Sequence, residues 1–465
     1  MISNESPRGK PEPELRRGIK PDFQTARSET LKRLVLKKFR IIDDAADIFG
    51  TLVVEDGIIR EIAAGFDDAG YSADMVIDGR GFGDGAVLMP AFVDLHAHFR
   101  DPGFPEKETL ESASLAAAAA GYGTVVCMAN TDPVIDTLEK ARSLKERSNA
   151  LGLIDLYPVL SLSKNMEGRE LSGIKDLPAA GALPLMLSED GKDLADDRLF
   201  FKAMGKARLL GIPVSCHCDF GGPEAEAAKA AGRPRAEWSR IEENNAVRRA
   251  IELGKQAGCH IHIAHVSTME AAALIRNEKK SPPANPRFTL TCEATPHHIG
   301  AAEKDAARMG ESRGRVNPPL RSEADRKAIA AAICDGTIDA IATDHAPHSE
   351  ADKAAGAPGF SGLETAFAVC LSTLNIDLRR LSALMSANPA RILGLYKGPG
   401  GRGRIAPGLR ADLVIADTRT VWKVRPEQFK SRGKCSPFTD RELRGKILMT
   451  IRGGTVTFGG ENGVK

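Results

Sequence analysis

Apolar and polar residues alternate regularly through the middle of the chain, between residues 83 and 390. Short apolar runs rich in β-branched residues are separated by stretches with helical spacing, such as ETLESASLAAAAAG. We find eight such runs, at residues 87–98, 123–130, 153–160, 182–190, 212–218, 260–267, 288–298 and 339–348. Strands that alternate with helices predict parallel βα units, and eight units within about 300 residues predict an α/β fold of the TIM-like (β/α)8 barrel type. A doubly wound open sheet is the alternative, but no G-x-G-x-x-G motif follows the first strand.

The two ends of the chain have a different pattern. Residues 31–82 and 391–465 contain short β-branched runs broken by Gly and Asp, as in GTLVVEDGIIREIAAG and KILMTIRGGTVTFGG. We expect these two segments to complete one small β-sheet module beside a barrel at 83–390. Residues 1–30 are polar, aperiodic and contain prolines, which predicts a mobile tail.

Composition narrows the function classes. The 465 residues carry a net charge of +2 and only 5% aromatic residues, so neither a nucleic-acid surface nor a polybasic membrane surface is indicated. A small-molecule substrate is the expected partner. Eight cysteines are too dilute for a disulfide framework, and the sequence has neither a membrane-spanning apolar stretch nor a secretory signal. These features favour a reducing cytoplasm.

Polar residues of functional types end seven of the eight predicted strands. In a barrel, the carboxyl ends of all strands lie on one rim, where active sites are built. Residues more than 200 positions apart in the sequence are therefore expected to converge there. The residues concerned are His96, His98, Asn130, Asp190, His217, His265, His297, His298, Asp344 and His348.

Strand geometry selects among the histidines. Because side chains alternate along a strand, His96 and His98 point the same way and can bind one ion together, with Asp94 behind them. His265 shares its face with Ile261 and Ile263, so we predict His265 as a ligand and a structural role for His260 and His262.

Each candidate also has a purely structural interpretation. The two histidines of an H-x-H pair can be hydrogen-bonded core residues, and Asp190 precedes a glycine, as turn aspartates do. His217 can be a buried imidazole, and Asp344 can cap a helix. The occurrence of all of them at successive strand ends favours a metal site.

Eight motifs, in this order, carry a resemblance to a known family: DLHAHFRDPG, TVVCMANTDP, LSEDG, SCHCD, AHVST, EATPHH, RVNPPLR and ATDHAPH. From about residue 50 to 420 the chain resembles the class I dihydroorotases of the amidohydrolase superfamily. The resemblance implies a (β/α)8 barrel, a small β-sandwich as the form of the module from residues 31–82 and 391–465, and two Zn²⁺ ions. It also implies reversible cyclisation of N-carbamoyl-L-aspartate to L-dihydroorotate in pyrimidine synthesis.

The resemblance also implies roles for individual residues. His96, His98 and Asp344 would bind the first metal, His217 and His265 would bind the second, and Asp190 would bridge the two. Asp344 would also transfer the proton during catalysis. The substrate would be bound by Arg100, Asn130, Asn317 and His348.

Arg100 is the residue that would favour an acidic ring over a neutral one. A planar guanidinium binds a carboxylate through two parallel hydrogen bonds. A salt bridge with Asp101 or Glu106 is the structural alternative for this side chain.

Three departures from the family pattern bear on specificity: MAN replaces Met-Pro-Asn at Asn130, HCDF replaces an acidic pair, and the loop APGFSGLE is shortened. Relatives such as dihydropyrimidinases, hydantoinases and allantoinases are therefore an alternative. They bridge their metals with a carbamylated lysine, for which Lys192 would be the candidate.

A non-catalytic dihydroorotase-like scaffold for aspartate transcarbamoylase is a second alternative, and the sequence leaves homodimer formation and association with that enzyme open.

Overall fold

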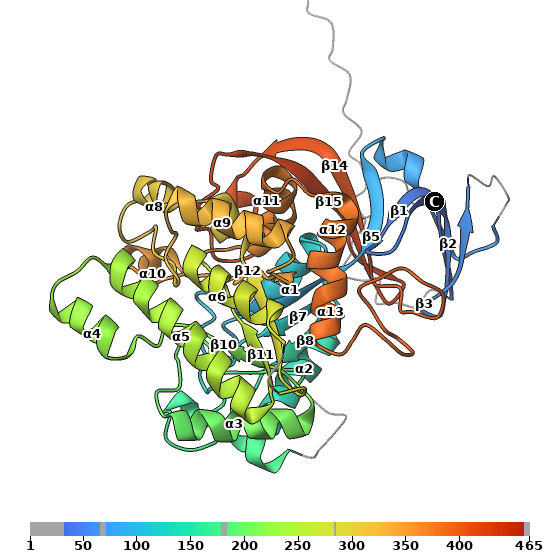
Figure 1. Ribbon diagram of the computed structural model, residues 1–465. Helices are drawn as coiled ribbons and strands as arrows, with labels where there is room; N and C mark the ends of the chain where they lie inside the picture. Colours follow the sequence, from blue (N-terminus) through green and yellow to red (C-terminus); the bar gives the residue numbers. More distant parts are fainter. Residues whose placement is uncertain (1–31, 66–70, 178–183, 283–284, 460–465) are drawn as a thin grey trace, which may run out of the picture.

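The computed structural model describes residues 32–65, 71–177, 184–282 and 285–459, so the tail predicted at residues 1–30 lies outside the described residues. Eight parallel strands form a barrel at the centre of the molecule (Figure 1). They are β6 (Phe92–Ala97), β7 (Tyr122–Cys127), β8 (Asp155–Pro158), β9 (Leu187–Ser188), β10 (Val214–Cys216), β11 (His260–Ile263), β12 (Thr289–Ala294) and β13 (Ala340–Ile341). Seven of these strands fall within the predicted runs, and β7 begins one residue before its run at 123–130.

The barrel consists of two sheets that are joined by two isolated β-bridges. Strands β6 to β8 form one sheet and strands β9 to β13 form another. Leu160 pairs with Leu187 between β8 and β9, and Ala97 pairs with His345 between β6 and the segment after β13. The prediction of a TIM-like barrel is confirmed.

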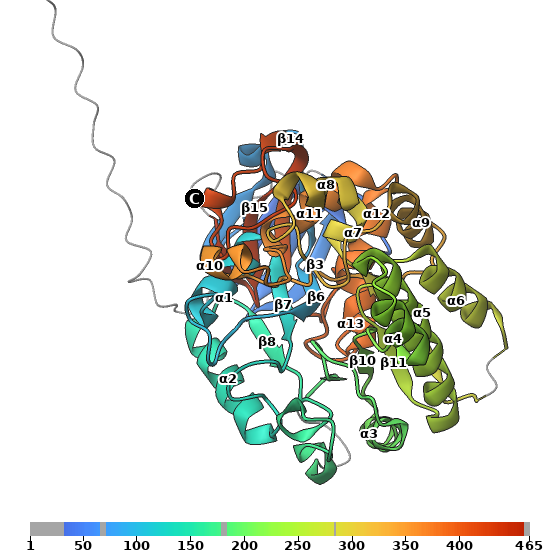
Figure 2. The ribbon, with the colours of Figure 1, turned by 90° about the vertical axis from the view of Figure 1, so that its left-hand side faces the viewer.

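Helices surround the barrel strands, and Figure 2 shows α1 and α2 on the opposite side of the strands from α5 and α6. The longer ones are α1 (Leu110–Ala119), α2 (Leu138–Leu151), α3 (Asp197–Leu210), α5 (Arg235–Ala257), α6 (Met269–Lys280) and α9 (Glu323–Cys334). The shorter ones are α4 (Gly222–Ala230), α7 (Pro296–Gly300), α8 (Glu303–Met309), α10 (Glu350–Ala354), α11 (Ala366–Thr373), α12 (Leu378–Ser382) and α13 (Asn388–Ile392). No helix of the described ranges is long and apolar enough to cross a membrane.

Polar residues at the helix starts anchor the loops that precede them. The side-chain oxygens of Thr109, Thr137, Thr268 and Ser322 each accept a hydrogen bond from a backbone N–H in the first turn of the helix that follows. Such a cap stabilises a helix by about 1 kcal/mol. The loops on the carboxyl side of the barrel are therefore fixed where each helix begins.

Both ends of the chain contribute to one mostly antiparallel sheet, seen in Figure 1 as blue and red strands beside the barrel. The strand order is β16–β15–β14–β5–β1–β2–β3, and β4 pairs with β1. The bounds are β1 (Arg33–Ile42), β2 (Asp47–Glu55), β3 (Ile58–Ala64), β4 (Met75–Asp78), β5 (Ala86–Pro90), β14 (Leu413–Lys423), β15 (Glu442–Arg452) and β16 (Thr455–Phe458). The sheet folds back on itself, since Ile59 exchanges backbone hydrogen bonds with Gly408 and Leu409, and it encloses its own apolar core.

The prediction of a single strand over residues 87–98 is wrong. It divides into β5, which belongs to the terminal sheet, and β6, which belongs to the barrel. Pro90 has no N–H to donate, and the next N–H, that of Ala91, donates to Asp412 O at 2.9 Å. Residues 86–90, expected inside the barrel range, therefore pair with the terminal sheet.

A buried ionic cluster joins the start of β8 to the C-terminal part of the chain. Asp155 accepts hydrogen bonds from Arg402 Nη1 at 2.6 Å and from Arg452 Nη2 at 2.8 Å, and Arg410 pairs with the same carboxylate. Burial raises the pKa of Asp155, but the charges of the three arginines outweigh burial, so the pKa lies well below its ordinary value. The cluster ties the barrel to the terminal sheet.

Candidate metal centre and substrate site

Three of the predicted ligands lie together at the ends of β6 and β13. His98 Nε2 is 3.2 Å and His96 Nε2 is 3.7 Å from Asp344 Oδ1. The three side chains are buried, and their ligand atoms lie within 4.8 Å of one another, close enough to hold one ion. The alternation along β6 therefore directs both ring nitrogens to the same point.

Asp190, which follows β9, lies between this group and the two remaining histidines. Its Oδ1 is 3.2 Å from His96 Nε2, 3.1 Å from His217 Nδ1 and 3.9 Å from His265 Nε2. Its Oδ2 is 3.4 Å from His98 Nε2. All six predicted ligands thus meet at one end of the barrel, around the carboxylate that was predicted to bridge two ions.

The chemistry of the cluster fits divalent cations. His96 Nε2 and Asp190 Oδ1 are buried without a hydrogen-bond partner among the described residues, although the two atoms face each other. Burial lowers the pKa of His96, but Asp190 and Glu293 outweigh burial and raise the pKa well above its ordinary value, so the site favours a positive charge here. Imidazole and carboxylate ligands suit zinc and similar metals.

The backbone at the site adopts unusual conformations. Arg100, His265 and Asp344 have φ angles of 57°, 33° and 43°, in a region that residues with a side chain rarely adopt. Each such conformation costs on the order of 1–3 kcal/mol and tends to occur at functional sites. The loops after β6, β11 and β13 are therefore shaped by local packing rather than by backbone preference.

Glu293 on β12 is a buried carboxylate that the sequence analysis missed. Its Oε1 is 2.9 Å from His96 Nδ1, and its Oε2 is 3.0 Å from His262 Nε2. Burial raises the pKa of Glu293, but hydrogen bonds from both histidines lower it to about 2. The ionised Glu293 accepts the proton of His96 Nδ1, so Nε2 is the nitrogen at which a bound cation would take the place of a proton. An acidic residue inside the apolar run TLTCEA was the available signal.

His217 has two polar neighbours on the ring nitrogen that points away from Asp190. Asp219 Oδ2 is 3.1 Å and Asn317 Nδ2 is 3.2 Å from His217 Nε2. Asn317 Oδ1 also accepts a hydrogen bond from Arg235. Asp219, in the divergent HCDF segment, is a second site residue that the sequence analysis did not identify.

The remaining predicted substrate residues line the same end of the barrel. Arg100 Nη2 is 3.3 Å from His348 Nε2, and Asn130 Oδ1 is 3.0 Å from His98 Nδ1. Burial, reinforced by the charge of Arg100, lowers the pKa of His348 to about 3, so its imidazole is neutral. Among the described residues Arg100 forms neither alternative salt bridge, with Asp101 or with Glu106, and Asp101 pairs instead with Arg147 at 2.6 Å.

Lys192, the candidate bridging lysine of the related enzymes, does not join the cluster. Its side chain is exposed, and Nζ donates a hydrogen bond to Met166 O at 3.2 Å. The fourth strand therefore presents the carboxylate of Asp190 to the histidines.

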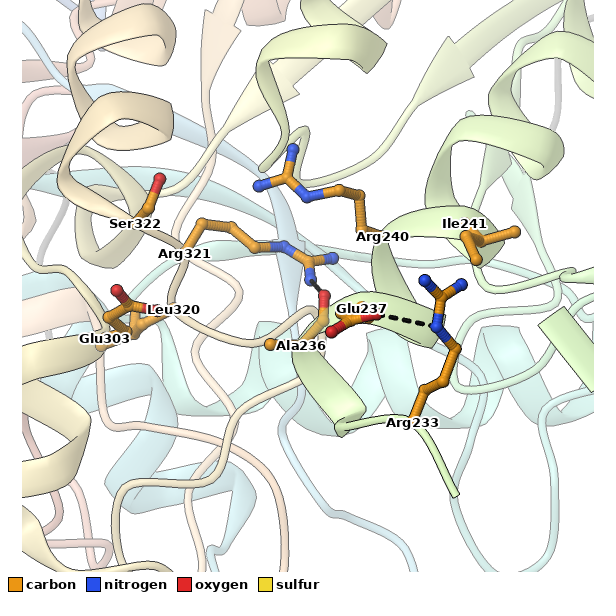
Figure 3. Close-up of a pocket in the computed structure, with 9 residues that line it drawn as sticks. All are labelled: Arg233, Ala236, Glu237, Arg240, Ile241, Glu303, Leu320, Arg321 and Ser322. Carbon is orange, nitrogen blue, oxygen red and sulfur yellow. Dashed lines mark hydrogen bonds and ion pairs between the residues drawn. The ribbon is translucent and has the colours of Figure 1, made fainter. Parts of the chain in front are cut away.

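A separate hollow of 330 Å³ lies beside the first turns of α5 (Figure 3). Its arginines already have carboxylate partners: Arg233 pairs with Glu237, Arg240 with Asp325 and Arg321 with Glu243. None of the predicted site residues lines this hollow. The candidate site is therefore the His/Asp cluster.

A (β/α)8 barrel with clustered His and Asp at the carboxyl ends of its strands, next to a small sheet from both chain ends, defines a metal-dependent hydrolase class. The model of the amidohydrolase family matches residues 87–457, and the chain belongs to this family. Within the family, the chain is similar to curated dihydroorotases. That of Clostridium botulinum (strain Eklund 17B / Type B) is 37% identical over 429 residues, which cover 91% of this chain and 99% of the relative. That of Anaeromyxobacter dehalogenans (strain 2CP-C) is 36% identical over 438 residues, 91% of this chain and 97% of the relative. The chain is thus a member of the dihydroorotase group.

Solved structures share the fold. The L-hydantoinase (dihydropyrimidinase) from Arthrobacter aurescens superposes with a TM-score of 0.77 at 26% identity, covering 92% of this chain and 98% of that chain. A dihydropyrimidinase from Brevibacillus agri NCHU1002 gives a TM-score of 0.75 at 19% identity, covering 93% of this chain and 96% of that chain. These likenesses support the barrel with a flanking sandwich.

Proposed function

We propose that this protein is a dihydroorotase, a cyclic amide hydrolase that interconverts N-carbamoyl-L-aspartate and L-dihydroorotate in pyrimidine synthesis. The observation that carries the proposal is the similarity to dihydroorotases along almost their whole length. The cluster of buried His and Asp side chains supports it, because hydrolysis of a ring amide requires an activated water and a proton carrier.

We propose two divalent ions, with zinc as the metal. His96, His98 and Asp344 would hold one ion, His217 and His265 the other, and Asp190 would contact both. When bound, such ions polarise a carbonyl group and lower the pKa of water. The distances between Asp190 and the four histidines support this assignment.

Asp344 is the proposed proton carrier. In the hydrolytic direction its carboxylate takes a proton from the water that adds to the ring carbonyl, and it delivers this proton to the ring nitrogen as the C–N bond breaks. In the biosynthetic direction it removes the proton from the ureido nitrogen. Burial raises the pKa of Asp344, but the hydrogen bond from His98 and the nearby histidine charges lower it below its ordinary value, so the side chain starts as a base.

Arg100 is proposed to bind the ring carboxylate, assisted by Asn130, Asn317 and His348. These four residues approach the end of the barrel from loops after β6, β7, β12 and β13. Arg100 Nε donates a hydrogen bond to Pro347 O at 3.3 Å, which orients the guanidinium before substrate arrives. A carboxylate is the ligand that a guanidinium recognises best.

A hydantoinase or dihydropyrimidinase activity is the second candidate, because solved structures with those names share the fold. A neutral ring offers no carboxylate to Arg100. The outward direction of Lys192 also argues against a lysine-bridged centre.

The test combines metal analysis with a substrate comparison. Purified protein should contain about two divalent ions per chain, and it should open dihydroorotate, followed by ultraviolet absorbance, faster than dihydrouracil or hydantoin. Chelator-treated protein is the control. A metal-free protein without turnover would favour the alternative function of a non-catalytic scaffold for aspartate transcarbamoylase. A preference for neutral rings would favour the hydantoinase or dihydropyrimidinase activity.

We further propose a cytoplasmic location. All eight cysteines are free, which supports this proposal. Light scattering of the pure protein would measure whether it forms a homodimer. Co-purification with aspartate transcarbamoylase from the same cells would test that association.

A further inference from the structure

Lys353 on α10 is a fully buried lysine whose partners are all backbone carbonyls. Its side chain has 0% exposure. Nζ donates to Arg315 O at 2.9 Å, to Ala357 O at 2.8 Å and to Gly359 O at 2.9 Å. An ammonium group has three donors and no acceptor, so these three hydrogen bonds saturate it.

The three carbonyls belong to two loops, one of which carries a proposed substrate residue and the other of which contacts one. Arg315 lies two residues before Asn317, and the 357–359 loop includes Pro358, whose carbonyl oxygen is 3.0 Å from His348 Nε2. The N–H of Gly359 also donates to Arg315 O, at 3.0 Å. Both loops therefore meet at one ammonium group.

The packing around this junction leaves little freedom. A Cβ atom at Gly359 would come within 2.5 Å of Ala346 O, and the backbone there has a φ of 144°. The Lys353 ammonium is 5.2 Å from the centre of the Phe360 ring. Burial lowers the pKa of Lys353, as expected for a charge removed from water, and a cation buried at such a cost needs a structural purpose.

We propose that Lys353 is a positioning residue that fixes the 315–317 and 357–360 loops and thereby sets the affinity for the acidic ring substrate. This inference rests on the proposed function. Lys353 touches neither the His/Asp cluster nor the proposed proton carrier, so its effect acts through Asn317 and His348. Substrate binding should depend on it more than the chemical step does.

The first test is Lys353→Met, which keeps most of the unbranched side chain and removes its charge and donors. We expect the KM for dihydroorotate to rise by about tenfold or more, because small misplacements of binding groups are costly, with kcat within about threefold and metal content unchanged. Lys206→Met is the matched control, since Lys206 Nζ donates to a single carbonyl, that of Leu177, away from the site. The control should keep both constants.

A second measurement does not depend on turnover. Amide hydrogen exchange at Gly359 and Ala346 should accelerate in Lys353→Met, because their acceptors, Arg315 O and Phe360 O, lie in the loops that Lys353 holds. Lys353→Gln retains an amide donor, and it replaces the Met variant if that variant does not fold; it should show a smaller rise in KM.

An unchanged KM together with unchanged exchange would overturn the inference and leave Lys353 a general stabilising residue. Equal falls in kcat and metal content would also overturn it. Failure of the proposed function is distinguishable, because in that case the wild-type protein itself would not open dihydroorotate.

Discussion

Replacement of Glu293 by glutamine should weaken metal binding, although Glu293 itself is not among the predicted ligands. Its two oxygens serve His96 Nδ1 and His262 Nε2 separately, at 2.9 and 3.0 Å. Glutamine has one acceptor oxygen, so one of the two ring nitrogens would face an N–H group. If the nitrogen that faces the N–H group is His96 Nδ1, the imidazole proton must move from Nδ1 to Nε2. A protonated Nε2 cannot bind a cation.

The structure sets the size of the effect. A hydrogen bond to a charged group contributes about 1.5–3 kcal/mol, and about 1.4 kcal/mol corresponds to a tenfold change in affinity. Metal affinity should therefore fall by about tenfold to a hundredfold, in line with the effect of partners that orient metal-binding histidines. Glu293→Leu, which removes both acceptors, should cost more.

The assay is competition between the protein and a chromophoric chelator, with metal content measured after dialysis. Thr291→Val is the matched control, because Thr291 Oγ1 contacts His262 Nδ1 at 2.9 Å from the opposite side of the ring and contacts no predicted ligand. The control should keep its metal affinity. Equal affinities of wild type and Glu293→Gln would refute the conclusion that Glu293 sets the proton position of His96.

Three further predictions follow from the site and the core. Asp344→Asn should retain most of its metal but lose about 10²- to 10⁴-fold in kcat, since the proton carrier is removed; turnover within tenfold of wild type would exclude this role. Arg100→Met should mainly raise the KM for dihydroorotate by removing the carboxylate contact, and an unchanged KM would assign Arg100 to structure. Asp155→Asn should lower the free energy of unfolding at pH 7 by about 3–5 kcal/mol, because three arginines lose their buried partner. The pKa of Asp155 is depressed in the folded protein, so this stabilisation exists above the ordinary value of 3.8 and is lost as the pH falls below it; denaturant titrations at several pH values should give a flatter profile for the variant.

The barrel and the meeting of six side chains could be predicted because the relevant signals are local. Seven of the eight apolar runs end in a polar residue, and parallel strands bring their carboxyl ends together whatever their separation in sequence. Even β9 and β13, which have two residues each, lie within runs that the pattern identified. The geometry of βα units thus converts a one-dimensional pattern into a site.

The features that could not be predicted depend on contacts between distant segments. Pro90 divides the first run between two sheets only because Asp412, more than 300 residues later, supplies the acceptor for the next N–H. The run TLTCEA marks Glu293 as unusual, but its role is defined only by the contacts of its two oxygens with His96 and His262. Lys353 likewise gains its meaning from carbonyls in two loops.

The central position of β5 in the terminal sheet has a consequence for how the polypeptide is made. One side of β5 pairs with β1, which is translated before it, and the other side pairs with β14, which is translated more than 300 residues later. Until residues 413–417 emerge, β5 presents an unpaired apolar edge, the kind of edge that recruits strands from other chains. A chain truncated before β14 would therefore keep this edge unpaired, and we expect such a chain to aggregate.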